Sequence, residues 1–473
     1  MKNEIILMIF CNRLRIFTLN FPTENLVISA IRINIASGNL IIKNMKKILC
    51  LLLSALCVAC GGNQEKLPEN QVGKNNIYEV NIRQYTPEGT MKAFEDGHLE
   101  RLHSQGVDIL WLMPIFPISE EGRKGTLGSY YAVQNYTAVN PEFGTLEDLQ
   151  HLVNHAHQLG MKVVLDWVAN HTGRDNVWVK EHKDFYNLDS LGNPAVPAGT
   201  DWDDVADLNY DNPNMRRAMI DAMKYWIQNA DIDGFRCDVA GMVPTDFWVE
   251  CRQELEKTKP LFMLAEDDNP EIHKAFDASY NWKIHHILNG IAQGKNTAKD
   301  LAAQYDTLLQ KFPKDAILMN FTSNHDENSW SKSEYDRMGD YVQTMAALTY
   351  FLPGMPLCYS GQEAANRKSL EFFEKDTIDF SALPLKEFYA NLNNLKHSHP
   401  ALWGNDVKFV SSDDNMLVFE RKGGDENILC IFNFSDAAKE YTADSKYKDI
   451  FNGNDTASPL KIDGKNYKIL TNK

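Results

Sequence analysis

A regular alternation of apolar runs and amphipathic helical patterns extends through most of this 473-residue chain. Short, nearly continuous apolar runs are typical of parallel strands that are buried on both faces. We expect eight such strands, at 77–82, 107–113, 162–167, 234–239, 261–265, 276–279, 316–321 and 356–359. Eight strand–helix units predict an α/β fold, a (β/α)₈ TIM barrel. An open doubly wound sheet is disfavoured, because no Gly-rich phosphate-binding turn follows the first strand.

Helix boundaries support this interpretation. Thr145 and Asp148 form the ends of a capping box that opens one helix, and Gly160 closes it. Asn212-Pro213 opens another. The four cysteines after residue 60 show no metal-like spacing, so we expect buried free thiols, at Cys237, Cys251, Cys358 and Cys430.

Two segments depart from the alternation and divide the chain. The connection at 172–210 is unusually long and lacks strong periodicity, and long loops are usually functional. After about residue 397, short alternating runs between Asp/Gly turns predict a C-terminal all-β sandwich domain at 397–473. The barrel domain is therefore expected at 76–396, with 172–210 as an insertion over its C-terminal rim.

The N-terminal part has the features of a targeting segment. Residues 45–59 contain a Met-Lys-Lys start and an apolar run at 48–58, which is too short to span a bilayer. With Cys60 they resemble a bacterial lipoprotein signal, which implies lipidation of Cys60, although a plain secretory signal is the alternative. We expect 1–44 to be a mis-assigned extension and 60–75 a flexible tether. The protein is then expected to be lipid-anchored in the bacterial envelope.

Charge limits the range of partners. The formal net charge is −16 and the pI is about 5.3, whereas nucleic acid phosphates require a basic patch. We therefore expect no nucleic acid partner. An acidic surface is compatible with a neutral substrate such as a sugar, and equally with solubility alone.

Acidic and His-containing clusters follow four of the predicted strands, although they are far apart in the sequence. Parallel barrel strands converge at one rim, where catalytic groups of such barrels are located. We therefore expect one shared site from the clusters at 166–171, 234–238, 265–268 and 324–328.

The residue types in these clusters fit glycosidic bond cleavage, in which one carboxylate attacks while a protonated one assists the leaving oxygen. We assign Asp238 as nucleophile, Glu266 as acid/base and Asp326 as a third carboxylate that binds sugar hydroxyls. Arg236 lies two residues before Asp238 on the same strand, so both point to one side and the arginine holds Asp238 ionised. His171 and His325 are expected to donate hydrogen bonds to the sugar.

The motifs together resemble glycoside hydrolase family 13, the α-amylase family. They are DWVANH (166–171), GFRCD (234–238), the lone Glu266 after an apolar strand, NHDEN (324–328), GSYYAV with NYTAVNPEFGT (128–145) and GMPLCYSGQE (354–363). The resemblance implies a retaining mechanism with these roles, stacking of Tyr131 on the sugar, and a short B domain at 172–210. Many amylases carry a Lys-His pair where this chain has Gly241 and Met242, so leaving-group contacts differ here.

The same resemblance raises the question of calcium. Asn170 and Asp207 match positions that bind structural calcium in many relatives, and oxygen ligands suit that ion. Related oligosaccharide hydrolases keep the asparagine without the metal, so both outcomes stay open. No cofactor is expected for the chemistry itself.

The sequence thus predicts an enzyme that hydrolyses α-glucosidic bonds, mainly α-1,4, of starch, maltodextrins or maltooligosaccharides. An α-glucosidase, a neopullulanase or a transglycosylase of the same family is the alternative within this chemistry. A non-catalytic amylase-like binding protein is the alternative outside it, although all three carboxylates are present. Bond preference, endo or exo action and oligomeric state stay open.

Overall fold

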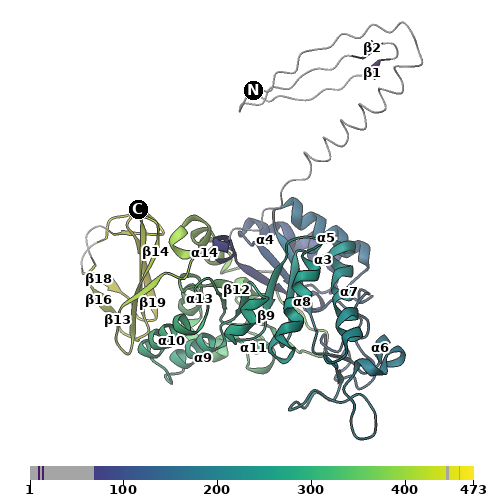
Figure 1. Cartoon of the computed structure of the whole chain (residues 1–473). Coiled ribbons are helices and arrows are strands. Elements are labelled where there is room, and N and C mark those ends of the chain that lie inside the picture. The colour runs from purple at the N-terminus through teal and green to yellow at the C-terminus, as the bar shows by residue number, and fades with distance from the viewer. Residues whose placement is uncertain (1–8, 11–12, 15–68, 444–446, 457–458) are drawn as a thin grey trace. The chain divides into compact units, whose positions relative to one another are not determined.

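The computed structural model of this protein describes residues 9–10, 13–14, 69–443, 447–456 and 459–473 (Figure 1). The chain forms two compact units, Met1–Gln64 and Glu65–Lys473. In the first unit, strands β1 (Ile9–Phe10) and β2 (Arg13–Leu14) pair antiparallel.

The predicted signal at 45–59 and Cys60 lie outside the described residues. Part of the predicted tether, however, is structured, because η1 (Glu69–Lys74) is a 3₁₀ helix. Val72 packs against the barrel interior, and Lys74 Nζ lies 5.2 Å from the centre of the Trp403 ring. The part that packs on the barrel therefore includes residues 69–74, which lie before the predicted boundary at 76. Among the described helices, none is long and apolar enough to cross a membrane.

Eight parallel strands close into a barrel, which confirms the predicted fold (Figure 1). The strands are β3 (Ile77–Val80), β4 (Ile109–Leu112), β5 (Lys162–Trp167), β8 (Gly234–Cys237), β9 (Phe262–Ala265), β10 (Ala278–Tyr280), β11 (Ile317–Asn320) and β12 (Met355–Tyr359). They pair in chain order, and β12 closes on β3. The sixth strand, β10, begins two residues later and ends one residue later than the predicted 276–279.

Strand alternation determines which side chains enter the barrel. Every second residue faces inward, and the apolar members form one interior cluster that includes Ile77, Ile109, Val164, Leu264 and Met355. The next inward positions on several strands carry polar or aromatic residues: Glu79, Trp111, Asp166, Arg236 and Tyr280. These five residues form the layer nearest the carboxyl ends of the strands, where the predicted site lies.

Helices surround the barrel (Figure 1). The longer ones are α5 (Leu146–Gln158), α7 (Pro213–Ala230), α8 (Thr245–Leu255), α9 (Trp282–Ala292), α10 (Ala298–Lys311), α13 (Val342–Phe351) and α14 (Lys386–Ser398). Shorter elements are α2 (Ile82–Tyr85), α3 (Met91–Phe94), the π-helical η2 (Glu95–Leu99), α4 (Glu100–Ser104), η4 (Ala240–Met242), η5 (Pro270–Lys274), α11 (His325–Trp330), α12 (Glu334–Met338), η6 (Gly339–Tyr341), η7 (Gln362–Ala364) and η8 (Pro400–Leu402). The predicted capping box of α5 and the Asn212 cap of α7 are both present.

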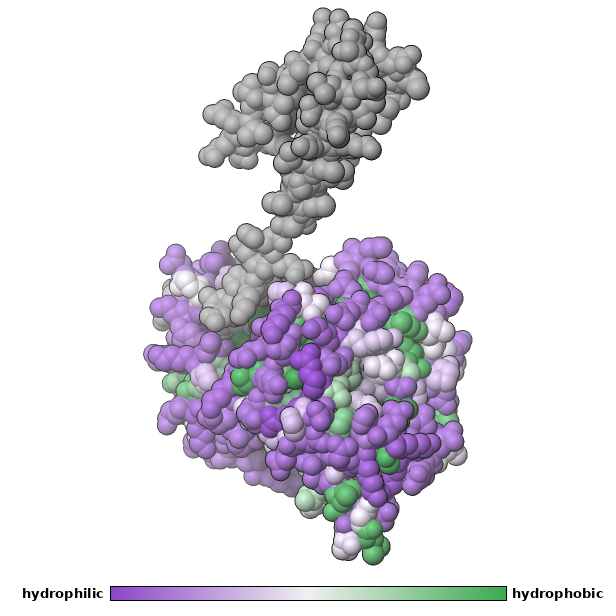
Figure 2. Space-filling view, turned by 45° about the vertical axis from the view of Figure 1, so that its right-hand side comes forward, coloured by the Kyte–Doolittle hydropathy of each residue, from purple (hydrophilic) through white to green (hydrophobic). Residues whose placement is uncertain are grey.

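The long connection after β5 contains short elements of its own, β6 (His171–Gly173), α6 (Val177–Glu181), η3 (Lys183–Phe185) and β7 (Val205–Asp207). Strands β6 and β7 pair antiparallel, so the insertion leaves the barrel and returns at the same point. Its tip exposes apolar side chains, including 84% of Leu191. Figure 2 shows a mostly hydrophilic face, with hydrophobic residues grouped at the lowest point of the domain.

The C-terminal region is all-β, as predicted. A five-stranded antiparallel sheet contains β13 (Val407–Ser412), β14 (Met416–Gly423), β15 (Glu426–Asn433), β19 (Asn466–Thr471) and β17 (Lys448–Asp449). A second sheet pairs β16 (Lys439–Tyr441) with β18 (Leu460–Ile462). One apolar cluster joins the two sheets, with Val418, Ile431 and Leu470 from the first and Leu460 and Ile462 from the second.

Two buried basic side chains, Arg421 and Lys396, join this domain to the barrel, and neither forms an ion pair with an acidic side chain of the described residues. Arg421 donates to the carbonyl oxygens of Phe351 (2.6 Å) and Asp406 (3.1 Å), and Lys396 Nζ donates to those of Gly354 (2.8 Å) and Leu402 (2.6 Å). Burial lowers the pKa of Lys396 well below its ordinary value. The domain junction is therefore fixed by hydrogen bonds to backbone carbonyls.

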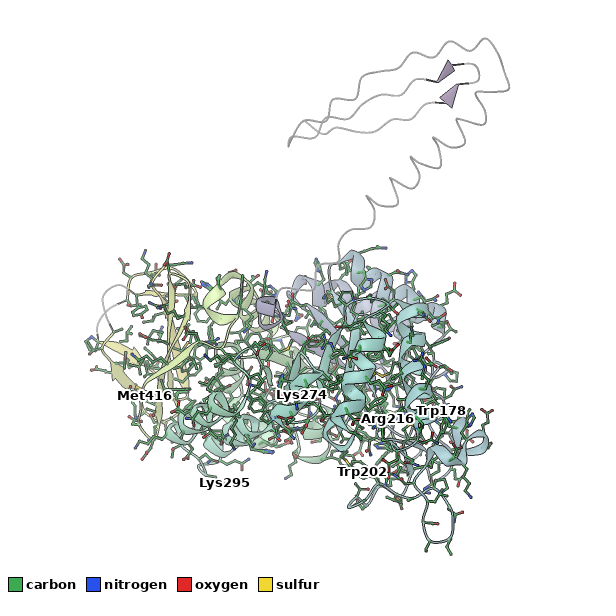
Figure 3. All side chains as sticks on the ribbon, in the orientation of Figure 1. Trp178, Trp202, Arg216, Lys274, Lys295 and Met416 are labelled. Carbon is green, nitrogen blue, oxygen red and sulfur yellow. The ribbon has the colours of Figure 1, made fainter. Side chains whose placement is uncertain are left out.

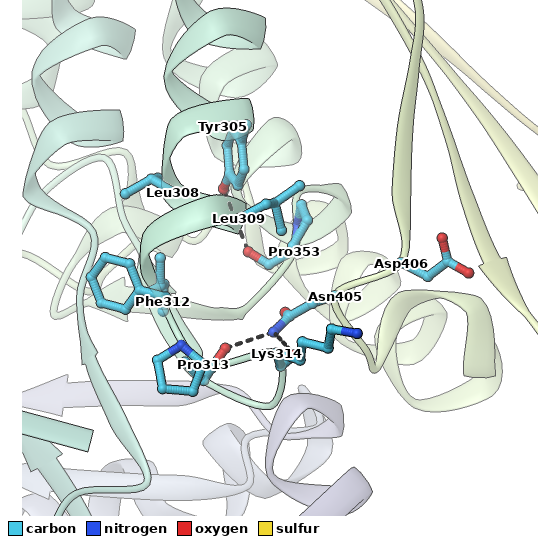
Figure 4. A pocket seen from close by; sticks show the side chains of 11 residues that line it. Tyr305, Leu308, Leu309, Phe312, Pro313, Lys314, Pro353, Asn405 and Asp406 are labelled. Atoms are coloured by element: carbon cyan, nitrogen blue, oxygen red, sulfur yellow. Dashed lines mark hydrogen bonds between the residues drawn. The ribbon is translucent and has the colours of Figure 1, made fainter. Parts of the chain in front are cut away.

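A cavity of about 500 Å³ lies at the same junction (Figure 4). It is lined by the end of α10 and by the segment that leads into β13. Its polar side chains bond within the protein, since Asn405 donates to the carbonyls of Lys314 and Ala316 and Tyr305 donates to that of Pro353. The cavity lies at the amino end of β11, opposite the rim that carries the predicted site.

Candidate active site

Arg236 is the centre of the predicted site. Its Nη1 lies 2.9 Å from Asp166 Oδ1 and 3.1 Å from Asp238 Oδ1, and its Nη2 lies 2.8 Å from Glu266 Oε2. Its Nε donates to the hydroxyl of Tyr280 at 3.1 Å. The arginine is fully buried, so its charge is compensated by three carboxylates rather than by water. Asp166 lies on strand β5, and Asp238 and Glu266 directly follow strands β8 and β9.

Asp166 connects this centre to two aromatic residues. Its Oδ2 accepts from Trp111 Nε1 and from the Tyr131 hydroxyl, each at 3.0 Å. Trp111 also lies 4.9 Å below the Arg236 guanidinium, as a cation–π partner. The sequence predicted Tyr131 as a site residue and placed Asp166 in the cluster at 166–171 that joins the site, but it did not predict Trp111 and Tyr280. Their signal was their inward register on barrel strands, which only strand pairing resolves.

His325 forms a second chain of contacts at the end of β11. Its Nδ1 lies 2.6 Å from Glu79 Oε1, and its Nε2 lies 2.7 Å from the Tyr131 hydroxyl and 3.3 Å from Asp326 Oδ2. Burial disfavours the charged ring, but the carboxylates of Asp326 and Glu79 outweigh burial and raise the pKa of His325 to about 9. His325 is therefore a cation at neutral pH. Glu79, a buried acid within an apolar strand, was also missed.

Asp326 lies in the first turn of α11, one residue after His325. Asn324 caps this helix by accepting from the backbone N–H of Glu327, which fixes the turn. The Asp326 side chain is 36% exposed, so it is the most accessible of the three predicted carboxylates.

The carboxyl groups of Asp238 and Glu266 share one neighbour, the guanidinium of Arg236. Burial first, and then the charge of Glu266, raise the pKa of Asp238, whereas Arg236 opposes them. Asp326 also contributes to this shift, which means that all three carboxylates lie within electrostatic reach of one another. Arg236 lies against both carboxyl groups and stabilises their negative charge.

A strained turn connects the two members of the pair. Val239, a β-branched residue, has a left-handed backbone with φ of 34°. Its N–H donates to Glu266 Oε2 at 2.8 Å, and the N–H of Ala240 donates to the Glu266 carbonyl at 3.1 Å. The turn after the predicted nucleophile therefore positions the predicted acid/base.

His171 lies apart from this network. Its ring is 5.4 Å from that of Trp202, and its Nδ1 lies 3.2 Å from the Asn170 amide nitrogen. Burial lowers the pKa of His171 to about 3, so the ring is neutral. Among the described residues no bond links it to the three carboxylates. It lies at the start of β6, on the inserted segment.

The aromatic residues of the rim loops divide into two groups. Trp178 packs against Tyr136 and Phe185. Tyr186 is buried, and its hydroxyl bonds to that of Thr172. Both aromatic residues therefore stabilise the inserted loop. Trp202, at the lower edge of the domain in Figure 3, and Trp330 are accessible. Trp330 is 59% exposed and its ring lies 5.1 Å from that of Phe372, which in turn stacks on Tyr131 at 6.3 Å.

The proposed calcium ligands do not form a suitable donor set. Asp207 Oδ2 accepts from the Asn187 amide at 2.7 Å, and the Asn170 amide faces His171. The neighbouring carbonyls are also used, since Tyr136 donates to those of 168 and 171 and Tyr210 donates to that of 169. Calcium takes about six to eight oxygen ligands. Within the described part of the chain, no group of three or more His, Cys, Asp or Glu could hold a metal ion.

The four cysteines at 237, 251, 358 and 430 are buried and free, as predicted.

Comparison with models of known protein families identifies the family of this chain. The model for the alpha amylase catalytic domain matches residues 74–191 and 199–429. The chain belongs to the alpha-amylase family. The model for the alpha amylase C-terminal all-beta domain matches residues 407–471, the sheets that follow the barrel.

Curated relatives in this family include the alpha-amylase MalA of Haloarcula japonica, 28% identical over 381 residues, which covers 76% of this chain and 55% of the relative. A cyclomaltodextrinase of a Bacillus species is 26% identical over 371 residues, covering 71% of this chain and 64% of that protein. The chain thus spans between half and two thirds of the length of these two relatives.

Solved structures show the same architecture. The alpha-amylase from Lactobacillus plantarum has a TM-score of 0.78 and 30% identity, and the match covers 85% of this chain and 99% of that one. The maltogenic alpha-amylase AmyB from Thermotoga neapolitana has the same TM-score, identity and coverage. Family membership and fold are therefore established.

Proposed function

We propose that this member of the alpha-amylase family is a retaining glycoside hydrolase that cleaves α-glucosidic bonds, mainly α-1,4, of starch, maltodextrins or maltooligosaccharides. The observation that carries the proposal is the bridging of Asp238 and Glu266 by one buried guanidinium, with one carboxylate on each terminal nitrogen. This arrangement favours the short carboxyl spacing of retaining enzymes, about 5–5.5 Å, over the wider spacing that admits an interposed water.

The proposed reaction has two steps. Asp238 attacks the anomeric carbon while Glu266 gives its proton to the glycosidic oxygen, so the leaving sugar departs with a hydroxyl and the other sugar forms an ester with Asp238. Glu266, now a carboxylate, then takes a proton from water, which attacks the same carbon and releases Asp238. Asp326, His325, Tyr131 and His171 are proposed to bind the sugar during both steps.

Incubation of the protein with maltoheptaose tests the proposal. New reducing ends are expected, and NMR should show that the first product released has the α configuration. Initial β product would mean inversion, and absence of cleavage at any pH would favour a non-catalytic binding protein.

The alternative activities differ in their products. Product profiles on amylose, pullulan and maltotriose separate an α-amylase from an α-glucosidase, a neopullulanase or a transglycosylase. Random shortening of amylose with intact pullulan would support the α-amylase assignment, and products longer than the substrate would support transglycosylation.

The charge on His325 gives a pH prediction. Only the doubly protonated ring donates from both nitrogens, to Glu79 and toward Asp326, and this form is present below about pH 9 and lost above it. We expect kcat/KM to fall as the pH rises through about 9. Because Glu79 is one of the groups that raise the pKa of His325, Glu79→Gln should move this fall to lower pH.

A matched control is Glu95→Gln, because Glu95 lies on the outside of the barrel and contacts His151 and His155 in the same manner. It should leave the pH profile unchanged. If the fall of kcat/KM at alkaline pH stays at the same pH in Glu79→Gln, the proposed role of the His325 charge is contradicted.

The exposed Trp330 ring gives a prediction on chain length. Pyranose rings present C–H faces that pack on aromatic rings. We expect Trp330→Ala to raise KM for maltoheptaose about five- to tenfold, and Trp330→Phe to retain most of the affinity. Equal KM values for Trp330→Ala and the unchanged protein would exclude this ring from substrate binding.

We further propose that Cys60 is lipidated and anchors the enzyme in the bacterial envelope, with 45–59 as the signal. The Met-Lys-Lys start, the short apolar run and the cysteine support this proposal. When cells express the full chain, labelling with an alkyne fatty acid should mark the mature protein that begins at Cys60, and Cys60→Ala should abolish the label. Labelling that persists in Cys60→Ala would contradict it, and a label-free secreted protein would support the plain signal.

A further inference from the structure

Two loops at the carboxyl rim of the barrel are bonded to each other. One loop, 119–128, follows β4, and the other, 366–376, follows β12 and η7. The N–H of Thr126 donates to Glu374 Oε1 at 3.0 Å, and the Thr126 hydroxyl donates to the other oxygen of the same carboxylate. We call these two joined loops the rim wall.

Backbone groups and the helix after β3 hold the rim wall together. The N–H of Leu127 donates to the carbonyl of Phe373 at 3.0 Å, which joins the two loops a second time. From helix α2, Arg83 Nη2 donates to the carbonyl of Leu127 at 3.2 Å, and Gln84 Nε2 donates to that of Glu371 at 2.8 Å. One helix therefore fixes both loops.

The rim wall is also attached to α11, the helix that carries Asp326. Asn328 of this helix donates from its amide to the carbonyl of Lys368 at 3.0 Å, and its Oδ1 accepts from the N–H of Leu370 at 2.8 Å. Because Asn328 is 4% exposed, water does not compete for these bonds. The wall therefore has a fixed position relative to the predicted carboxylate.

Two aromatic side chains connect the rim wall to the predicted site. The Phe372 ring lies 6.3 Å from that of Tyr131 and within 11° of its plane, and the Trp330 ring lies 5.1 Å from that of Phe372. Burial raises the pKa of Asp326, and a hydrogen bond from the Trp330 side chain opposes this shift, so Trp330 lies beside Asp326. The wall thus begins next to residues that are proposed to bind the sugar.

The rim wall lies across the barrel from Glu266. In the closed barrel, β3 and β9 are separated by three strands in either direction, and the two loops of the wall follow the neighbours of β3. Glu266 follows β9 and protonates the glycosidic oxygen, so the leaving sugar departs on its side. The part of the substrate that keeps the non-reducing end therefore extends toward β3, where the wall stands.

We propose that the enzyme acts from the non-reducing end of its substrate, because the rim wall admits one glucosyl unit at Tyr131 and one more at Trp330 but no longer chain on that side. This inference rests on the proposed glycosidase function and adds its mode of action. A cleft open at both ends binds the middle of a polymer, whereas a site closed at one end measures the length of the piece that it removes. The expected products from that end are glucose or maltose.

Two para-nitrophenyl α-maltoheptaosides test the proposal, one with a free non-reducing end and one with an ethylidene acetal on its terminal glucose. An enzyme that cleaves inside a chain acts on both. We expect kcat/KM for the blocked substrate to be at least about a hundredfold lower, because the acetal would clash with the wall. Chromatography of the nitrophenyl products from the free substrate should show the loss of one or two glucosyl units in the first cleavage.

Variants that open the rim wall complete the test. Phe372→Ala removes the ring next to Tyr131, and Glu374→Ala removes the bonds from Thr126. Each should raise kcat/KM for the blocked substrate about tenfold or more. Phe451→Ala, which removes an aromatic ring of the C-terminal domain that is 45% exposed, is the matched control and should leave both values unchanged. Thermal midpoints show whether each variant is folded, and Glu374→Ala decides if Phe372→Ala is not.

The outcomes separate the two proposals. If the unchanged protein cleaves neither substrate, the proposed glycosidase function itself fails. If it cleaves both substrates equally well, that function stands and only action from the non-reducing end is overturned. If it cleaves the free substrate alone, but the folded variants of the wall still leave the blocked substrate intact, the wall is not the barrier and the inference is overturned as well.

Discussion

Replacement of Asp238 by asparagine is expected to lower kcat on maltoheptaose by on the order of 10⁴-fold or more, while the protein stays folded. The amide has the shape of the carboxyl but cannot form the ester with the anomeric carbon. Because burial and the Glu266 charge both disfavour an ionised Asp238, the substitution removes an unfavourable charge. The thermal midpoint of Asp238→Asn should therefore equal or exceed that of the unchanged protein.

The control is Asp246→Asn, since Asp246 is an exposed aspartate in α8 whose partner is Arg216 at 2.8 Å. It should retain full activity. Added azide supplies the missing nucleophile: with an aryl maltoside, Asp238→Asn should form a β-glycosyl azide, because azide attacks from the face that the carboxylate vacated. Substantial turnover of maltoheptaose by Asp238→Asn, in a preparation free of other amylases, would remove Asp238 as the nucleophile.

The fold was predictable because it depends on local patterns. Apolar runs, the capping box at Thr145 and the Asn212-Pro213 cap define strands and helices one at a time, and a barrel needs only their order. The weakest strand signal, at 276–279, was displaced by two residues at its start and one at its end, since β10 is only three residues long. The limits of the tether at 60–75 were also misjudged, because η1 is held by contacts with the distant Trp403.

The three carboxylates were predictable for the same reason, since each follows a recognisable strand end. The residues that surround these carboxylates were not predictable in this way. Glu79 and Trp111 reach the site through strand register and barrel closure, which bring β3 beside β12 and β4. A buried acid in an apolar strand is the only local sign of Glu79.

Removal of the Arg236 charge should damage both stability and catalysis. In Arg236→Met, the carboxylates of Asp166, Asp238 and Glu266 lose the cation that they share at 2.8–3.1 Å. Removing one partner of a buried ion pair costs about 3–5 kcal/mol, because the remaining charge stays uncompensated. We expect a loss of this size in the free energy of unfolding, together with loss of measurable hydrolysis.

The pH dependence of this loss identifies its cause. The uncompensated groups are carboxylates, which become neutral as the pH falls, so the stability difference between Arg236→Met and the unchanged protein should shrink toward acid pH. Denaturant unfolding of both proteins at several pH values measures this difference in stability. A deficit that is independent of pH would indicate lost packing, since the arginine also fills space between Trp111 and Tyr280.

Arg421→Met separates this electrostatic role from the general cost of removing a buried arginine. Arg421 is as buried as Arg236, but it donates to backbone carbonyls at the domain junction and forms no ion pair with an acidic side chain in the part of the chain that the structure describes. Its loss should destabilise the protein without the acid-dependent recovery, and the folded fraction should keep its kcat. Arg236→Lys completes the series: it restores the charge but lacks the fork that contacts Asp238 and Glu266 through separate nitrogens. Stability should largely return in Arg236→Lys while activity stays low, because compensation needs only a cation, whereas catalysis needs the two carboxyls held on one rigid plane.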